Sequence, residues 1–445
     1  MGGVRFDFLS LRWYTLILTY DPPGEPILTK GLLTDNGMMM TSAVAVNILS
    51  FLLNAYAARA LGPAEFGALG SLLAAYLIVS LPLSTLSLLF ARSVATFVAH
   101  QDTAGIASLL RIGLISLCLL GIIELIVIAL LSPQIATFLQ ISSSEPVILM
   151  GLAIACAPSL FALRGALQGL QNFANLSFNI SFEAATRFLG VVLLVGVGLG
   201  LNGAIGAYGL APLLALAIGL FSLRRFLTGE GPLDKFSLQA LPQNWLGFFV
   251  LFTCLAAMNQ IDVVVVKHFF SPEEAGLYHA AASLGKTLLF VAGILNQTMF
   301  PKVTEAQAKG ANSLPILKEY LAYVIGLCTL GIVTIWVAAP QLLWVTFGQS
   351  YVGAAPLLRL FGLAAGLMSL VSILVHYRVA ADDLWPLRAI GLATVGESLI
   401  LWFIHPALSA VVWALIAINM ITLLSLTLCK TPQQASQECP PGPFA

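Results

Sequence analysis

The chain contains twelve apolar runs, each long enough to cross a lipid bilayer as a helix. The hydrocarbon core of a bilayer is about 30 Å thick, and about 20 helical residues span it. Lipid offers the backbone no hydrogen bonds, so spanning segments are helices or a closed barrel, and the absence of period-2 alternation selects helices. We predict spans at residues 38–60, 67–90, 108–131, 146–167, 176–199, 203–223, 245–267, 276–300, 317–339, 355–377, 384–404 and 406–428.

The composition agrees with a chain that is dissolved mainly in lipid. Of its 445 residues, 59% are hydrophobic and only 9% are charged, whereas about 25% of the residues of a soluble domain are charged. The formal net charge is zero, which argues against a nucleic-acid partner. The six cysteines form no CxxC pair and the five histidines show no metal-ligand spacing, so we expect neither a metal nor another cofactor.

A short motif occurs twice, 209 positions apart, as Pro63-Ala64-Glu65-Phe66-Gly67 and Pro272-Glu273-Glu274-Ala275-Gly276. Each copy follows a long apolar run that ends in a cation, Arg59 or Lys267, and each copy precedes another apolar run. The copies occupy equivalent places in two successive sets of six spans, which indicates a duplicated six-helix unit. Because six is even, both units enter the membrane with the same polarity. We therefore predict an all-α membrane protein with two parallel six-helix bundles around a central cavity.

The duplication also predicts the domain organisation. We expect an N-terminal bundle at 38–223, a cytoplasmic linker at 224–244, a C-terminal bundle at 245–430 and a disordered tail at 431–445. The first 37 residues do not fit this scheme, because their apolar stretch is too short to span and ends at a Pro-Pro-Gly sequence. They are either an interfacial segment or an extension from a misplaced start, with Met38 as the true first residue.

The distribution of Lys and Arg predicts the orientation of the helices. Fifteen of the twenty lie at one set of helix ends, and only Arg59, Lys267 and Arg359 lie at the other. The remaining two, Arg187 and Lys286, lie within spans. Positive residues stay on the cytoplasmic side, so both termini are expected in the cytoplasm.

Three stretches carry a resemblance to a known family. They are residues 57–67 (AARALGPAEFG); Asp262 with its valine run and then 271–281 (SPEEAGLYHAA); and 164–171 (RGALQGLQ), before a span that ends at 200–204 (GLNGA). From about Met38 to Lys430 the chain resembles the oligosaccharide and polysaccharide flippases of the multidrug/oligosaccharidyl-lipid/polysaccharide exporter (MOP) superfamily.

The resemblance implies a transporter of twelve or fourteen helices with a MOP/MATE-like fold, and this chain fits the twelve-helix form. Such proteins move polyprenyl-diphosphate-linked sugars across the bacterial inner membrane. The implied partners are the lipid-linked oligosaccharide and the bilayer, with the glycosyltransferases or polymerase of the same pathway as further candidates. The N-terminal extension has no counterpart in this family, and no motif identifies a sugar.

The two cations within spans are the strongest candidates for a substrate site. A charge at mid-bilayer costs about 2.5–3.5 kcal/mol on the insertion scale and normally marks a pathway or an internal pair. Arg187 on the fifth span and Lys286 on the eighth belong to different halves, so a central cavity would let both bind one diphosphate group. The alternative is that Glu183 and Arg187, four residues apart, simply pair along their own helix.

Carboxylates within the spans are candidates for ion coupling. Asp262 either binds a coupling proton or cation, orients Lys286, or caps contacts between the first helices of the two bundles, which we slightly favour. Glu124, isolated in the third span, is either a hydrogen-bonded protonated acid or a proton relay, with even weight on each. Three arginines near the cytoplasmic helix ends either form a collar that receives phosphate or, as such residues do more often, only enforce topology: Arg92, Arg164 and Arg378.

The leading hypothesis is a flippase for a lipid-linked oligosaccharide that works by alternating access. A cation-coupled multidrug exporter of the same superfamily is the first alternative, although the deepest charges here are basic. A membrane polysaccharide polymerase or glycosyltransferase is less favoured, because the outer loops at about 132–145 and 340–354 are brief and carry no acid–base group. We expect no catalytic residues, and the Gly285-Lys286-Thr287 sequence lacks the context of a phosphate-binding loop.

Overall fold

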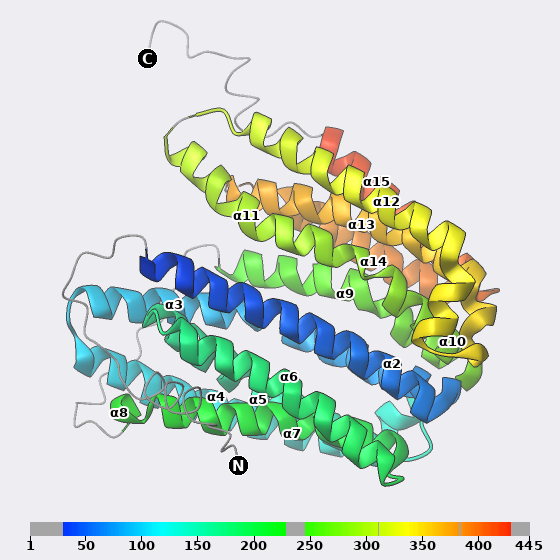
Figure 1. The fold of residues 1–445 in the computed structure, drawn as a ribbon, viewed down its shortest axis with the longest axis horizontal. Helices are drawn as coiled ribbons and strands as arrows, with labels where there is room; N and C mark the ends of the chain where they lie inside the picture. Colours follow the sequence, from blue (N-terminus) through cyan, green and yellow to red (C-terminus); the bar gives the residue numbers. More distant parts are fainter. Residues whose placement is uncertain (1–29, 228–244, 310, 382, 384, 429–445) are drawn as a thin grey trace, which may run out of the picture. The chain divides into compact units, whose positions relative to one another are not determined.

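The computed structural model describes residues 30–227, 245–309, 311–381, 383 and 385–428, and within these residues the chain is helical, without strands (Figure 1). The first half contains α2 (Lys30–Ser80), α3 (Ser84–Ala99), α4 (Thr103–Phe138), α5 (Glu145–Gly169), α6 (Phe173–Gly196), α7 (Gly200–Ser222) and the short α8 (Arg224–Leu227). The second half contains α9 (Trp245–Phe269), α10 (Pro272–Gly285), α11 (Leu288–Ala308), α12 (Leu314–Thr346), the 3₁₀ helix η2 (Gln349–Ala354), α13 (Ala355–Ala380), α14 (Trp385–Phe403) and α15 (Leu408–Leu428).

The predicted membrane spans are confirmed. Eleven helical segments of the described chain are long and apolar enough to cross a membrane. The first of them, Gly37–Ala99, contains two predicted spans, and each of the twelve predicted spans lies on one of these segments to within three residues at its ends. Of the predicted terminal and linker regions, residues 1–29, 228–244 and 431–445 lie outside the described residues.

Gly62 separates the first two spans within α2. Its backbone angles, φ 74° and ψ 173°, lie in a region that is open to glycine and costly for other residues. Pro63 follows directly and cannot donate a backbone hydrogen bond. The glycine and the proline together explain why the helix changes direction here.

Two predicted spans are interrupted, although the apolar pattern predicted continuous helices. The second span breaks at residues 81–83, between α2 and α3, where Pro82 removes a backbone donor. The eighth span breaks at Lys286 and Thr287, between α10 and α11, where no proline is present. The breaks therefore occur in the second span of each half, and interruptions at corresponding positions of two repeats are typical of transporter binding regions.

The described residues form two compact units. Unit 1 comprises the described parts of Met1–Asn54, Leu83–Pro133 and Ser143–Pro242, and unit 2 those of Ala55–Pro82, Gln134–Ser142 and Gln243–Ala445. The predicted bundle boundaries and the central cavity stay predictions.

Unit 1 is built around α5 and α7, which pack against each other, with α3 on α5 and α6 on α7 (Figure 1). Small residues let α5 and α3 approach closely. A Cβ on Gly169 would lie 2.5 Å from the carbonyl oxygen of Ala91, and one on Gly165 would overlap the carbonyl oxygen of Ser87. Glycines four residues apart commonly allow such close helix packing in lipid, where dispersion replaces the hydrophobic effect.

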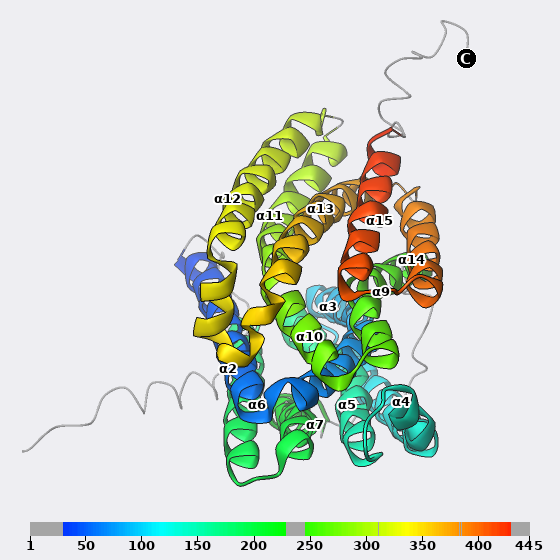
Figure 2. The ribbon, with the colours of Figure 1, turned by 90° about the vertical axis from the view of Figure 1, so that its right-hand side faces the viewer.

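Unit 2 is built around α13, which packs against α10, α11, α12 and α15 (Figure 2). Helix α14 packs against α9 and α15. The most buried span of this unit is the one that contains α13, just as α5 is the most buried span of unit 1. These are the fourth spans of the two halves, so burial repeats with the duplication.

The two copies of the duplicated motif contact each other within unit 2. A Cβ on Gly67 would lie 2.7 Å from the backbone nitrogen of Gly276, and one on Gly276 would overlap the carbonyl oxygen of Pro63. The ring of Phe66 packs on His279 with centroids 4.7 Å apart. Equivalent residues meet in this way at a two-fold axis. The contact supports the duplication and explains why residues 55–82 belong to unit 2.

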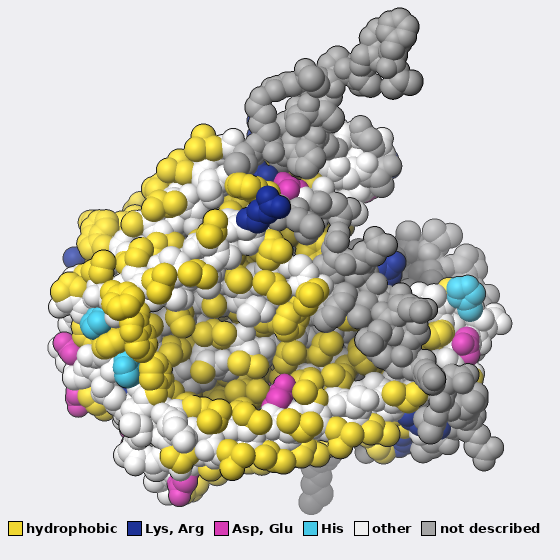
Figure 3. Space-filling model, turned by 180° about the vertical axis from the view of Figure 1, so that it is seen from behind, with side chains coloured by type: hydrophobic (Ala, Val, Ile, Leu, Met, Phe, Trp, Pro, Cys, Tyr) yellow, Lys and Arg dark blue, Asp and Glu magenta, His cyan; other side chains and the backbone are white. Residues whose placement is uncertain are grey.

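The outer surface of the helices is apolar, as a lipid environment requires. Hydrophobic side chains are spread over the face drawn in Figure 3, and few charged side chains interrupt them. Large side chains such as Val197, Val337 and Leu428 are more than 70% exposed. Such exposure is unfavourable in water and unremarkable against acyl chains.

Candidate functional site

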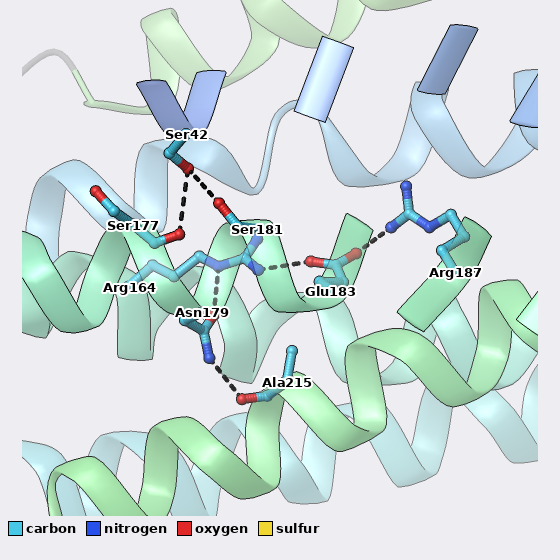
Figure 4. A network of polar contacts seen from close by, with 8 residues as sticks. All are labelled: Ser42, Arg164, Ser177, Asn179, Ser181, Glu183, Arg187 and Ala215. Carbon is cyan, nitrogen blue, oxygen red and sulfur yellow. Dashed lines mark hydrogen bonds and ion pairs between the residues drawn. The ribbon is translucent and has the colours of Figure 1, made fainter. Parts of the chain in front are cut away.

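Unit 1 buries a cluster of two arginines and one glutamate (Figure 4). Arg164 on α5 donates to Glu183 on α6 at 2.6 Å, and Arg187 donates to the other oxygen of the same carboxylate. Arg164 also donates to the amide oxygen of Asn179 at 2.9 Å. We call Arg164, Glu183 and Arg187 the unit 1 cluster.

The local structure of α6 positions this cluster. Glu183 precedes Arg187 by four residues, the favourable order for an ion pair along a helix. Asn179, one turn before Glu183, donates to the carbonyl oxygen of Ala215 on α7 at 2.7 Å, which fixes α6 against α7. The guanidinium of Arg187 lies 4.8 Å from the ring centroid of Tyr208, also on α7, a cation–π distance. Both arginines are therefore held in defined orientations.

The unit 1 cluster carries one positive charge in excess, because two cations share one carboxylate. The side chain of Glu183 is 8% exposed, that of Arg164 15% and that of Arg187 22%. Both carboxylate oxygens of Glu183 thus accept from the arginines, and the side chain of Arg187 is the most exposed of the three. Glu183 and Arg187 do pair along their own helix, as the alternative to a substrate site predicted. The three side chains of the cluster together still have one more base than acid.

Unit 2 buries a second cluster around Asp262, which is fully buried on α9. Lys286, at the break after α10, donates to the two carboxylate oxygens at 2.9 and 3.1 Å and also to the carbonyl oxygen of Asn259. Tyr278 on α10 donates its hydroxyl to the same carboxylate at 3.0 Å. Asp262 therefore contacts Lys286. Its predicted roles in orienting Lys286, in ion binding and in capping contacts between the bundles stay predictions.

Glu397 on α14 completes what we call the unit 2 cluster: Asp262, Lys286 and Glu397. Glu397 is 1% exposed, and its Oε1 atom has no hydrogen-bond partner among the described residues. Helix α14 packs against α9, the helix that carries Asp262. Glu397 was not among the site residues predicted from the sequence. Its position near the middle of the predicted span at 384–404 could have identified it, because an acid within a membrane span is a functional candidate by default.

The other predicted residues lie apart from these clusters or have local partners. Arg378 is 3% exposed and donates to Asp383 at 2.6 Å and to the carbonyl oxygen of Leu426 at 2.7 Å, which ties the ends of α13 and α15 together. Arg92 is exposed on α3. The structure thus gives a phosphate collar no support at Arg378, and the collar stays a prediction.

Glu124 on α4 is half-buried, and one of its carboxylate oxygens is buried without a hydrogen-bond partner among the described residues. A role as proton relay stays a prediction. Arg187 and Lys286 belong to different units, and each is paired with a carboxylate of its own unit. A joint anion site of the two also stays a prediction. Within the described residues, no group of three His, Cys, Asp or Glu side chains is arranged to hold a metal ion.

Residues 32–307, more than half of the chain, match the profile of a protein family described as "Polysaccharide biosynthesis protein". No curated protein matches the chain in sequence.

Three solved structures of similar fold are all described as MATE transporters. The inward-facing form of a multidrug resistance MATE family transporter of the MOP superfamily is 11% identical, covers 89% of this chain and 96% of its own, and has a TM-score of 0.71. The outward-facing form of such a transporter is 15% identical, covers 95% and 98%, and has a TM-score of 0.61. A eukaryotic MATE transporter, AtDTX14, is 13% identical, covers 92% and 99%, and has a TM-score of 0.63. Identities this low establish the fold and not the substrate.

Proposed function

Because the chain belongs to the polysaccharide biosynthesis protein family, we propose that it is a flippase for a polyprenyl-diphosphate-linked oligosaccharide. Its family and its MATE-like fold make it a membrane transporter of the MOP superfamily. In the proposed reaction it moves the lipid-linked sugar from the cytoplasmic to the outer leaflet by alternating access, during polysaccharide biosynthesis.

The observation that carries the proposal is the excess positive charge of the unit 1 cluster. Glu183 neutralises one of two arginines, so the cluster as a whole attracts an anion. A diphosphate that crosses the bilayer needs a counter-charge, since an isolated charge there costs about 2.5–3.5 kcal/mol. Arginine presents a planar fork of N–H donors that matches phosphate oxygens. Arg187, the more exposed of the two, is the group proposed to bind the diphosphate.

A reconstituted transport assay tests this function. Full-length protein in liposomes is supplied with a fluorescent polyprenyl-diphosphate-linked sugar, and the fraction that becomes accessible in the opposite leaflet is measured. Replacing Arg187 with Gln removes a charge-assisted contact worth about 1.5–3 kcal/mol, so we expect a loss of roughly 10- to 100-fold in transport rate. Lys318→Gln, at an exposed position of α12, is the matched loss of one cation and should leave the rate unchanged. No movement above protein-free liposomes would sink the proposal.

A cation-coupled multidrug exporter is the second candidate function. Two buried acids in unit 2, Asp262 and Glu397, favour it, because intramembrane carboxylates commonly take part in ion pathways. The two functions differ in what Arg187→Gln does in cells. A flippase should lose surface polysaccharide at unchanged drug tolerance, whereas an exporter should lose drug tolerance at unchanged polysaccharide.

An enzymatic function is not part of the proposal. The segments that sequence analysis assigned to outer loops are largely helical, since α4 continues to Phe138 and α12 to Thr346, followed by η2. These two segments therefore contain fewer residues outside helices, where a catalytic site would lie, than the predicted loops did.

The proposed setting is the bacterial inner membrane, with both termini in the cytoplasm, as the distribution of Lys and Arg favours. The glycosyltransferases or polymerase of the same pathway are the proposed protein partners.

A further inference from the structure

Five aromatic rings pack together at helix ends in unit 2. They belong to Phe138 at the end of α4, His268 and Phe269 at the end of α9, Trp402 in the last turn of α14, and His405 just after α14. All five lie in unit 2, since this unit includes residues 134–142 of the first half. We call them the ring cluster. Under the orientation that the distribution of Lys and Arg predicts, these helix ends face away from the cytoplasm.

The rings of the cluster hold one another in place. The ring of His268 stacks on that of Phe138, with centroids 4.2 Å and planes 14° apart, and lies nearly parallel to Trp402 at 5.5 Å. Phe269 meets Trp402 edge-on at 5.1 Å and stacks on His405 at 3.8 Å. Stacked and edge-to-face aromatic pairs are favourable, so the ring cluster has a defined shape.

Two hydrogen bonds hold the end of α4 against α9. The Nδ1 atom of His268 lies 2.7 Å from the carbonyl oxygen of Phe138, and the side-chain amide of Gln140 donates to the carbonyl oxygen of His268 at 2.7 Å. A carbonyl oxygen only accepts, so Nδ1 of His268 is the donor. A surface held in this way loses little freedom when a ligand binds, which favours affinity.

The ring cluster combines an exposed ring with an unsatisfied polar atom. Trp402 is 42% exposed. The Nδ1 atom of His405 is buried and has no hydrogen-bond partner among the described residues. Both side chains contact Phe269, so the two features belong to one small group of rings. Buried polar atoms are normally hydrogen-bonded, so this nitrogen marks a position for a ligand group.

Anchoring in the membrane interface does not account for this arrangement. A tryptophan anchors a helix end through its own amphipathic ring. Trp344, near the end of α12, has that simpler form: it is 56% exposed and makes no ring contact within the part of the chain that the structure describes. A stack of rings held by hydrogen bonds goes beyond what an anchor needs.

We propose that the ring cluster is a carbohydrate-binding site. A sugar ring stacks its C–H face on the exposed indole of Trp402, and one of its hydroxyl groups forms a hydrogen bond with Nδ1 of His405. A hydroxyl group both donates and accepts, so it satisfies this nitrogen in either tautomer of the neutral imidazole. The choice of ligand rests on the proposed function: the site receives the glycan of the lipid-linked oligosaccharide on the side away from the cytoplasm.

The other parts of the proposed substrate fit the ring cluster less well. A polyprenyl or acyl chain would cover Trp402 but would leave Nδ1 of His405 unsatisfied. A diphosphate needs cations, and the ring cluster contains neither Lys nor Arg. Lys267, which precedes His268 in the chain, is itself only 1% exposed. The hydroxyl-rich glycan is the part that matches both the exposed ring and the unsatisfied nitrogen.

Equilibrium binding of two matched probes tests the site without transport. Full-length protein in lipid nanodiscs is titrated into a fluorescent short-chain prenyl diphosphate linked to glucose, or into the same prenyl diphosphate without sugar, and fluorescence anisotropy gives each Kd. Glucose is the probe because its equatorial hydroxyl groups leave a C–H-rich face free for stacking. We expect Trp402→Ala to weaken binding of the glucose probe by roughly 3- to 10-fold, the contribution of one aromatic contact, and to leave binding of the sugar-free probe unchanged.

Three further variants separate stacking from folding and from anchoring. Trp402→Phe keeps a ring and should retain most of the affinity. His405→Leu removes the hydrogen bond and should weaken only the glucose probe; it tests the site independently if the circular dichroism of Trp402→Ala shows loss of helix. Trp344→Ala is the matched control, because it removes a comparably exposed tryptophan outside the ring cluster, and it should leave both Kd values unchanged.

Any of four results would overturn the site: equal affinity of the wild type for both probes, an unchanged Kd of the glucose probe in both Trp402→Ala and His405→Leu, equal weakening of both probes in Trp402→Ala, or the same loss in Trp344→Ala. The liposome assay keeps this outcome separate from the proposed function. A wild type that prefers the glucose probe but moves no lipid-linked sugar would reject the flippase and leave the carbohydrate site standing. A wild type that transports without preferring the glucose probe would reject the site and leave the flippase.

Discussion

Each unit of the protein contains a named cluster of three charged side chains that are buried or mostly buried, and the two clusters differ in the ratio of acids to bases. In unit 1, the carboxylate of Glu183 lies between two arginines, Arg164 and Arg187. In unit 2, Lys286 pairs with Asp262 on α9, and a second buried acid, Glu397, lies on α14, which packs against α9. Counted by residue type, the unit 1 cluster has one more base than acid and the unit 2 cluster one more acid than base, so removal of the same kind of side chain should have opposite consequences in the two units.

The contrast follows from the duplication. Arg187 is on the fifth span of the first half, and Glu397 is on the fifth span of the second half. They are 210 positions apart, one more than the 209 positions that separate the two copies of the motif. A basic and an acidic side chain, Arg187 and Glu397, thus lie at nearly the same place in the two halves. The two clusters thus differ in residue type at equivalent places of the duplicated unit.

Removal of the shared carboxylate in unit 1 should have the largest effect on stability. Glu183→Ala leaves Arg164 and Arg187 largely buried without an anion, and breaking a buried pair in this way costs about 3–5 kcal/mol. The measurement is the free energy of unfolding in mixed micelles, titrated with SDS. The double variant Glu183→Ala/Arg187→Ala removes one of the two stranded cations and should lose less than the single variant. If the double variant loses as much or more free energy of unfolding, the cost in Glu183→Ala does not come from leaving Arg187 without its carboxylate.

Removal of one cation from each cluster should reduce stability by different amounts in the two units. Arg187→Gln leaves Arg164 paired with Glu183 and brings the unit 1 cluster to neutrality, so it should cost less than about 1 kcal/mol. Lys286→Gln leaves Asp262 buried without its cation and should cost about 1–3 kcal/mol. The same SDS titration measures both variants.

The dependence on pH adds a check to this pair of variants. Protonated carboxyl groups need no counter-charge, so acidification should restore part of the stability of Lys286→Gln. Arg187→Gln has no stranded carboxylate and should gain nothing in comparison. Equal losses in both variants at every pH would contradict the opposite charge balance of the clusters.

The sequence predicted the architecture well because lipid leaves the backbone few alternatives. All twelve spans and the duplicated motif follow from apolar length and spacing, and the pairing of Glu183 with Arg187 follows from their separation of four residues. These features are local or depend on one helix only.

The remaining site features depend on contacts between helices, which a single sequence does not contain. Arg164 reaches Glu183 from α5, and Glu397 lies on α14, which packs against α9, the helix of Asp262. A helix that is apolar on all sides gives no sign of which face points inward, so the inward direction of Glu397 had no signal in periodicity. The break at Lys286 was also unpredicted, since no proline or glycine pair interrupts the span there.

The glycine contacts compare the packing of the two units. A Cβ on Gly276 would overlap the carbonyl oxygen of Pro63 in unit 2, and one on Gly165 would overlap that of Ser87 in unit 1. Backbone atoms cannot yield as flexible side chains do, so alanine at either position should cost about 1–3 kcal/mol. Gly293→Ala is the matched control, because nothing lies within 4 Å of its would-be Cβ on α11. Because alanine has a higher helix propensity than glycine, Gly293→Ala should leave the free energy of unfolding unchanged or raise it slightly.

The smallest expected effect distinguishes the two copies of the duplicated motif. In the second copy, Ser271 caps α10: its hydroxyl accepts from the backbone of Glu274, and the Glu274 side chain accepts from the backbone of Ser271. In the first copy, the equivalent position is Gly62, which has no side chain to cap with and adopts φ 74°. Ser271→Ala should therefore cost about 1 kcal/mol, and Ser271→Gly only a few tenths.

The reverse exchange completes this test. Gly62→Ser introduces a good capping residue but forces it into a backbone region that costs residues other than glycine about 1–3 kcal/mol. We therefore expect Gly62→Ser to destabilise the protein by more than Ser271→Gly does, in the same SDS titration. If the serine at position 62 were neutral or stabilising, the backbone of the first copy would have relaxed toward that of the second, and the two copies would be structurally interchangeable at their starts.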